Sequence, residues 1–237
     1  MSALKDKVHK LKKNDLLTFI GMIVLALFVA KIPLLNLPFS WTETFFHEIS
    51  HGLAALITFG KIVSIELNFD GSGLCTTRGG FNILISFSGY AGACLWGALM
   101  YVIVDHNVSH KIVDRIASLI LTLIALSCVF WCRDIATLLI MAVIALPFII
   151  ILKTKELLIE RFYMQFTGIF ILLSAIKSPL ALFDGEKIGD GANLAKMTFI
   201  PEFIWVFTWM ALGIGILALL LFRHIQMDRD KVIFRKK

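Results

Sequence analysis

Seven apolar stretches of roughly membrane-spanning length limit what this chain can fold into. A helix of about 20 apolar residues crosses the hydrocarbon core of a bilayer, and backbone polar groups there must bond to one another, so we expect helices. Charged residues make up only 17% of the chain, which argues against a water-soluble domain. The stretches are 16–35, 39–59, 81–104, 116–131, 135–152, 162–182 and 203–222, the fourth and fifth being somewhat short.

These stretches predict an all-α polytopic membrane protein with six or seven helical elements. We treat residues 1–237 as a single integral-membrane domain, with a basic N-terminal segment at 1–15 and a basic C-terminal tail at 223–237. By the positive-inside rule both termini should be cytoplasmic. Basic clusters beside apolar spans indicate lipid headgroups as partners, and not nucleic acid. We therefore expect an integral protein of the bacterial plasma membrane.

Two cytoplasmic termini require an even number of crossings, whereas the sequence contains seven apolar stretches. One stretch must then fail to cross. The leading candidate is 39–59, which is polar and short and is bounded by Pro38 on one side and Gly60 on the other. The other solution is a merger or partial insertion around Arg133 and Asp134.

Residues 61–80 are the only segment with strand character. A β-rich run is followed by Asp70-Gly71-Ser72-Gly73 and a return run, which predicts a short β-hairpin. The edge of such a hairpin could hold a substrate in extended form. The alternative is a tight connector between two helices.

The stretch 81–104 opens with small residues. Their spacing would let another helix approach closely, so we expect tight helix packing there. They are Ser86, Ser88, Gly89, Gly92, Ala93 and Gly97.

The motif HExxH occurs once, inside 39–59, as His47, Glu48 and His51. Two histidines four residues apart share one helix face, so both imidazoles can bind one Zn²⁺, and the glutamate can act on a water beside the metal. Buried ionisable groups cost roughly 2.5–3.5 kcal/mol each in a membrane helix, so they call for a partner such as a metal ion. A surface helix can also carry the motif by chance, but the flanking Phe45, Phe46 and Ile49 do not describe a solvated face.

The chain resembles the M50B-like group of membrane metallopeptidases, distant relatives of the site-2 proteases. The resemblance rests on F-H-E-I-S-H-G-L-A-A-L-I-T-F-G-K at 46–61, D-G-S-G at 70–73, S-G-Y-A-G at 88–92 and G-D-G-A-N-L-A-K-M-T-F-I-P-E-F-I-W-V-F-T-W at 189–209. It implies that His47 and His51 bind zinc and that Glu48 is the general base.

A third metal ligand is harder to assign. Site-2 proteases supply an aspartate from an N-P-D-G or L-D-G motif, and this sequence has neither. We rank Asp190 first because it lies in the late block of the resemblance, then Asp134 between two apolar stretches, then Asp184 in F-D-G. Structural alternatives are helix capping for Asp184 and Asp190, and an ion pair with Arg133 for Asp134.

We therefore predict a zinc-dependent intramembrane or membrane-adjacent endopeptidase that hydrolyses membrane-protein or peptide substrates. One alternative is a metal-binding regulator of the same fold without catalysis. Another is a small ion or proton transporter, because ionisable residues inside membranes also mark ion pathways. The substrate, the side of the membrane that the site faces and the oligomeric state stay open.

Overall fold

The fold is a bundle of helices that carries one short β-hairpin. The computed structural model describes residues 15–104, 109–154, 156–184 and 188–235, and for residues 15, 184 and 228–235 it describes the backbone alone. The elements are α2 (Asp15–Val29), α3 (Pro33–Ile57), β1 (Lys61–Leu67), β2 (Gly73–Arg78), α4 (Asn82–Ile103), α5 (His110–Phe130), α6 (Ile135–Thr154), α7 (Leu157–Lys177), the 3₁₀ helix η1 (Ser178–Asp184), α8 (Asp190–Thr198) and α9 (Glu202–Arg235).

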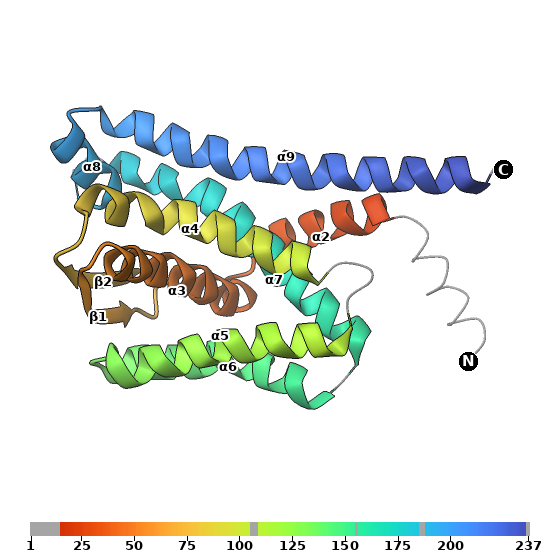
Figure 1. The fold of residues 1–237 in the computed structure, drawn as a ribbon, viewed down its shortest axis with the longest axis horizontal. Coiled ribbons are helices and arrows are strands. Elements are labelled where there is room, and N and C mark those ends of the chain that lie inside the picture. The colour runs from red at the N-terminus through yellow and green to blue at the C-terminus, as the bar shows by residue number, and fades with distance from the viewer. Residues whose placement is uncertain (1–14, 105–108, 155, 185–187, 236–237) are drawn as a thin grey trace.

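The predicted fold class is confirmed. The seven apolar stretches correspond to α2 to α7 and α9, and the hairpin follows the HExxH helix α3. The short helix α8 and the 3₁₀ helix η1 are additional, because they form within the polar segment before the last span. Figure 1 shows α9 along one side of the bundle, α5 and α6 along the opposite side, and α3, α4 and α7 between them.

Five helices of the described chain are long and apolar enough to cross a membrane, and a sixth span results if α2 and α3 are counted together. These two helices are bent by 110° at the break between them. Proline at the first position of a helix is favourable, and α3 begins at Pro33. The prediction that Pro38 bounds the HExxH helix is wrong, since Pro38 lies inside α3.

The outer faces of the long helices are apolar. Leu119 and Val129 on α5 and Leu219 on α9 are each about 70% exposed, at 69%, 71% and 70% respectively. The interior is filled by aromatic rings, including Phe45, Phe46 and Trp209, which are fully buried. Such exposed apolar faces suit contact with lipid, and the chain is an integral membrane protein.

Small residues on α4 allow close packing on two sides, as predicted. A Cβ atom at Gly97 would lie 2.7 Å from the carbonyl oxygen of Gly168 on α7. A Cβ atom at Gly92 would overlap the hydroxyl of Ser50 on α3. Helix α4 therefore fits between α3 and α7 with its backbone almost in contact with both.

The hairpin is held between α3 and the turn that joins α5 to α6. Strands β1 and β2 are antiparallel, with Ile65 opposite Cys75 and Leu67 opposite Gly73. On the outer edge of β1, the Ile65 N–H donates to the carbonyl oxygen of Trp131 at 2.9 Å. Both strands pack against the HExxH helix, with Ile62 of β1 and Cys75 of β2 lying beside Gly52 of α3.

Candidate metal centre

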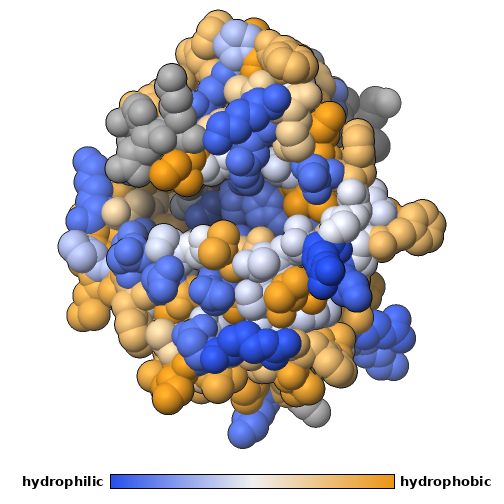
Figure 2. Space-filling view, turned by 90° about the vertical axis from the view of Figure 1, so that its left-hand side faces the viewer, coloured by the Kyte–Doolittle hydropathy of each residue, from blue (hydrophilic) through white to orange (hydrophobic). Residues whose placement is uncertain are grey.

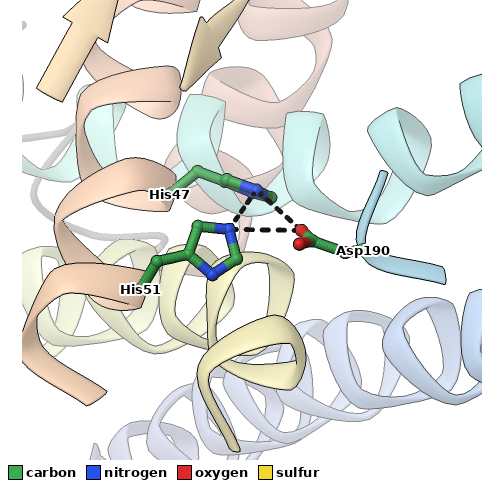
Figure 3. A group of neighbouring side chains, drawn as sticks. All are labelled: His47, His51 and Asp190. Carbon is green, nitrogen blue, oxygen red and sulfur yellow. Dashed lines mark hydrogen bonds and ion pairs between the residues drawn. The ribbon is translucent and has the colours of Figure 1, made fainter. Parts of the chain in front are cut away.

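Three side chains from two distant parts of the chain meet at one point. Helix α3 supplies His47 and His51, and the first residue of α8 supplies Asp190 (Figure 3). The two Nε2 atoms lie 3.1 Å apart, and each lies 3.2 Å from Oδ2 of Asp190. Among the described residues, these three are the one group of histidine, cysteine, aspartate or glutamate side chains arranged to hold a metal ion.

The triangle is close to the size of a tetrahedral zinc site and slightly smaller. Bonds of about 2.0–2.2 Å at the tetrahedral angle place neighbouring ligand atoms about 3.3–3.5 Å apart. The three observed separations are 3.1, 3.2 and 3.2 Å. Three donor atoms, two imidazole nitrogens and one carboxylate oxygen, are also the usual protein contribution to a catalytic zinc. The residues present therefore fit the ion.

The orientation of His51 is fixed from outside the triangle. Its Nδ1 lies 2.6 Å from the backbone carbonyl oxygen of Ile85 on α4. A carbonyl only accepts hydrogen bonds, so Nδ1 carries the hydrogen and donates. In the neutral imidazole, Nε2 then has its lone pair free and directed at the triangle. This is the outer hydrogen bond that zinc-binding histidines generally make.

The backbone of α4 lies against the two imidazoles of the triangle at Gly89. A Cβ atom there would lie 2.5 Å from Nε2 of His47 and 2.5 Å from Nε2 of His51. Contacts this short do not occur, so only glycine allows α4 to lie against both imidazoles. Gly89 thus has a specific reason to lack a side chain.

The side chain of Glu48 is buried beside the triangle and faces the hairpin. It is 6% exposed, and its charged neighbours are His47, His51 and Asp190. The backbone N–H of Cys75 on β2 donates to its carboxylate. A Cβ atom at Gly73 would lie 2.9 Å from Oε1 of Glu48. The hairpin therefore holds this carboxylate next to the place where a metal ion would bind.

Asp190 reaches the triangle because a tight turn starts α8. Gly189 has φ of +101°, a conformation that favours glycine, and its carbonyl oxygen accepts the first helical hydrogen bond from Asn193. Burial alone would raise the pKa of Asp190, but the imidazoles of His51 and His47, where they are protonated, lower it below its ordinary value. The carboxylate is thus held in the ionised form that binds metal.

The structure places Asp134 away from the triangle, and of Asp184 it describes only the backbone. Asp134 lies in the turn before α6, where its carboxylate accepts hydrogen bonds from the backbone N–H and the hydroxyl of Thr137. These bonds outweigh desolvation and hold its pKa below the ordinary value. Arg133 donates to backbone carbonyls, one of them that of Phe130. The side chain of Asp184 lies outside the described part of the structure.

Water can reach the triangle. The side chains of His47 and Asp190 are 13% and 17% exposed, so the site is not sealed. Figure 2 views the end of the bundle at which the hairpin and α8 lie, and this face is hollowed near its centre, with hydrophilic residues in the hollow. The geometry thus combines a buried metal-binding group with access for water.

Sequence reasoning did not find two further residues of this site. Glu43 lies one turn before His47, is 7% exposed, and has His47 and Glu48 as its charged neighbours. The ring of Tyr90 lies edge-on to that of His47, with centroids 4.5 Å apart. The four-residue spacing between Glu43 and His47 could have indicated Glu43. Tyr90 lies in the S-G-Y-A-G block at 88–92, which carries part of the resemblance, but it was not singled out there.

Comparison with known proteins gives one match. The family model described as Peptidase M50B-like matches residues 20–220, which include the hairpin and all three residues of the triangle. No curated protein and no solved structure matches the chain.

Proposed function

The chain belongs to the Peptidase M50B-like family, and we propose that it is a zinc-dependent endopeptidase that cleaves other membrane proteins. The observation that carries the proposal is the triangle of His47, His51 and Asp190 atoms at 3.1–3.2 Å. A buried carboxylate, Glu48, lies beside it. These are the parts that hydrolysis of a peptide bond by a metalloprotease needs.

In this proposal the three residues of the triangle hold the ion, and Ile85 keeps His51 in the tautomer that binds it. When bound, zinc supplies Lewis-acid chemistry, because it lowers the pKa of water from about 15.7 toward 7 and polarises the scissile carbonyl. Glu48 takes a proton from the attacking water as the water oxygen bonds to the carbonyl carbon. Glu48 then delivers that proton to the amine nitrogen as the carbon–nitrogen bond breaks.

The substrate should reach this site from one side of the membrane. Helix α2 begins and α9 ends at the end of the bundle opposite the hairpin and α8 (Figure 1). That opposite end also carries Lys111 and Arg115 at the start of α5 and Lys153 at the end of α6. By the positive-inside rule we place it in the cytoplasm of a bacterial cell. The metal centre then opens toward the outside of the plasma membrane.

The proposal is tested by co-expressing the chain with a panel of tagged single-span membrane proteins. Wild type should cleave at least one of them. Glu48→Gln should retain zinc, since glutamate is not a ligand in this arrangement, while cleavage falls by at least about 10²-fold. A variant that keeps zinc and cleaves at the wild-type rate would show that Glu48 is not the base. A wild type that binds zinc and cleaves nothing would favour a regulator without catalysis.

A further inference from the structure

We infer that the Tyr90 hydroxyl donates a hydrogen bond to the carbonyl oxygen of the scissile bond as negative charge develops on it. This inference rests on the proposed peptidase function and adds a second catalytic residue to Glu48. Tyr90 lies on α4 directly after Gly89, the residue whose backbone touches both imidazoles.

The ring of Tyr90 packs against two other rings. Its centroid lies 4.5 Å from that of His47 at an interplanar angle of 81°. Its centroid also lies 4.8 Å from that of Trp209, a fully buried residue of α9. Trp209 is itself fixed, because its Nε1 donates to the carbonyl oxygen of Phe87 at 3.0 Å. A ring packed in this way positions its hydroxyl before any substrate binds.

The Tyr90 hydroxyl makes no hydrogen bond to the described residues. Tyr90 is only 9% exposed. The carboxylates that act on the hydroxyl electrostatically are those of Asp190, Glu43, Glu48 and Glu202, and no described residue accepts a hydrogen bond from it. Although most of the ring is buried, solvent still reaches the hydroxyl oxygen, so the hydroxyl is free to donate to a group that enters the site.

A substrate carbonyl supplies the missing acceptor. When water adds to the carbonyl carbon, the π electron pair moves to the carbonyl oxygen, and donors placed before the reaction stabilise this charge. The phenol keeps its proton throughout, because Glu48 carries the proton that water loses. Tyr90 therefore acts as a hydrogen-bond donor, and no atom is transferred to or from it.

The alternative role for Tyr90 is to position Asp190, whose charge acts most strongly on its hydroxyl. The two roles differ in what they change. Loss of a donor to the developing charge lowers kcat and leaves zinc binding intact. Loss of a hydrogen bond to a metal ligand weakens zinc binding, typically by about 10–100-fold.

The test uses the full chain purified in detergent with zinc and a substrate that wild type cleaves. Tyr90→Phe removes only the hydroxyl, so the packing against His47 and Trp209 stays. We expect kcat to fall by about 10²–10³-fold, with KM and zinc content unchanged. In Tyr90→Phe, the affinity for a phosphonamidate peptide, which imitates the charged carbonyl oxygen, should fall together with kcat. The affinity of the zinc-free variant for the uncleaved peptide should equal that of zinc-free wild type.

The matched control is Tyr101→Phe on the same helix. The Tyr101 hydroxyl lies 2.8 Å from Nε2 of His224, far from the triangle along α4, and its loss should leave kcat close to that of wild type. Unchanged kcat in Tyr90→Phe, or loss of its zinc, overturns the inference while wild-type cleavage still supports the peptidase. A wild type that retains no zinc and cleaves nothing overturns both.

Discussion

Gly89 lies so close to the imidazole of His51 that even a methyl side chain at position 89 would clash with the ring. A Cβ atom on Gly89 would be 2.5 Å from both Cε1 and Nε2 of His51. The close approach places the backbone of α4 directly against the nitrogen that we assign to zinc. It also explains how the Ile85 carbonyl, one turn earlier on α4, reaches Nδ1 of the same ring.

Gly89→Ala should therefore displace the imidazoles and reduce zinc retention by at least tenfold. The backbone of α4 is packed between α3 and α7 and cannot move away, so the imidazoles of the histidines must shift instead. Zinc per chain after dialysis against a weak chelator measures the effect. Gly215→Ala is the matched control, because a Cβ atom there meets nothing within 4 Å. Equal zinc retention in the two variants would show that the histidines at this contact do not bind the ion.

Asp190→Asn should weaken zinc retention clearly more than Asp134→Asn or Asp184→Asn. Asparagine keeps the shape of aspartate but removes the charge from the third corner of the triangle. Asp134 caps the start of α6, where its carboxylate accepts hydrogen bonds from Thr137. Asparagine caps helices about as well as aspartate, so Asp134→Asn should change little. Zinc content and thermal unfolding of the three variants test this assignment. If all three hold zinc equally, the third ligand is not one of these carboxylates.

The thiol of Cys75 should react slowly in the zinc-free protein. Burial, with the carboxylates of Glu48 and Asp190, raises its pKa to about 12. The thiolate is the reactive form, so at pH 8 alkylation should be roughly 10³-fold slower than for an ordinary thiol of pKa about 8.5. The rate should rise about tenfold per pH unit up to that raised pKa. Mass spectrometry of iodoacetamide adducts measures it, with the thiol introduced by Ser72→Cys as the exposed reference.

The hairpin and the chain end should lie on opposite sides of the membrane. Ser72 is exposed at the hairpin turn, so Ser72→Cys should be labelled in intact cells by a maleimide that cannot cross membranes. Lys237→Cys should be labelled only after permeabilisation. Wild type, with its four free native cysteines, gives the background. Labelling of the chain end in intact cells, with protection of the hairpin, would reverse the proposed orientation of the site.

The membrane fold was largely predictable because hydropathy alone determines which segments can cross a bilayer. The boundaries were less predictable, since apolar length does not reveal where a helix breaks. The stretch 16–35 ends as a helix at Val29, and Pro33 begins the next helix. The conflict between seven stretches and an even number of crossings disappears if α2 and α3 form one bent span.

The pair of histidines was predictable because four-residue spacing fixes their relation within one helix. The approach of Asp190, 143 residues from His47 in sequence, depends on how η1 and α8 fold back, which no local pattern encodes. Asp134 was ranked second because it lies between two apolar stretches, yet it lies at a helix start, where its carboxylate accepts a hydrogen bond from the Thr137 hydroxyl. Gly89 looked like a packing residue, and its contact with both imidazoles emerges only when α3 and α4 meet.

The metal content of detergent-purified protein tests the central claim most directly. Wild type and His47→Ala should be prepared side by side without chelators, and zinc measured by mass spectrometry against protein concentration. Because His47 supplies one of the three ligand atoms, we predict about one zinc per chain in wild type and its loss in the variant, with both proteins equally folded. Two preparations that are equally free of zinc would contradict the metal centre, and the proposed peptidase with it.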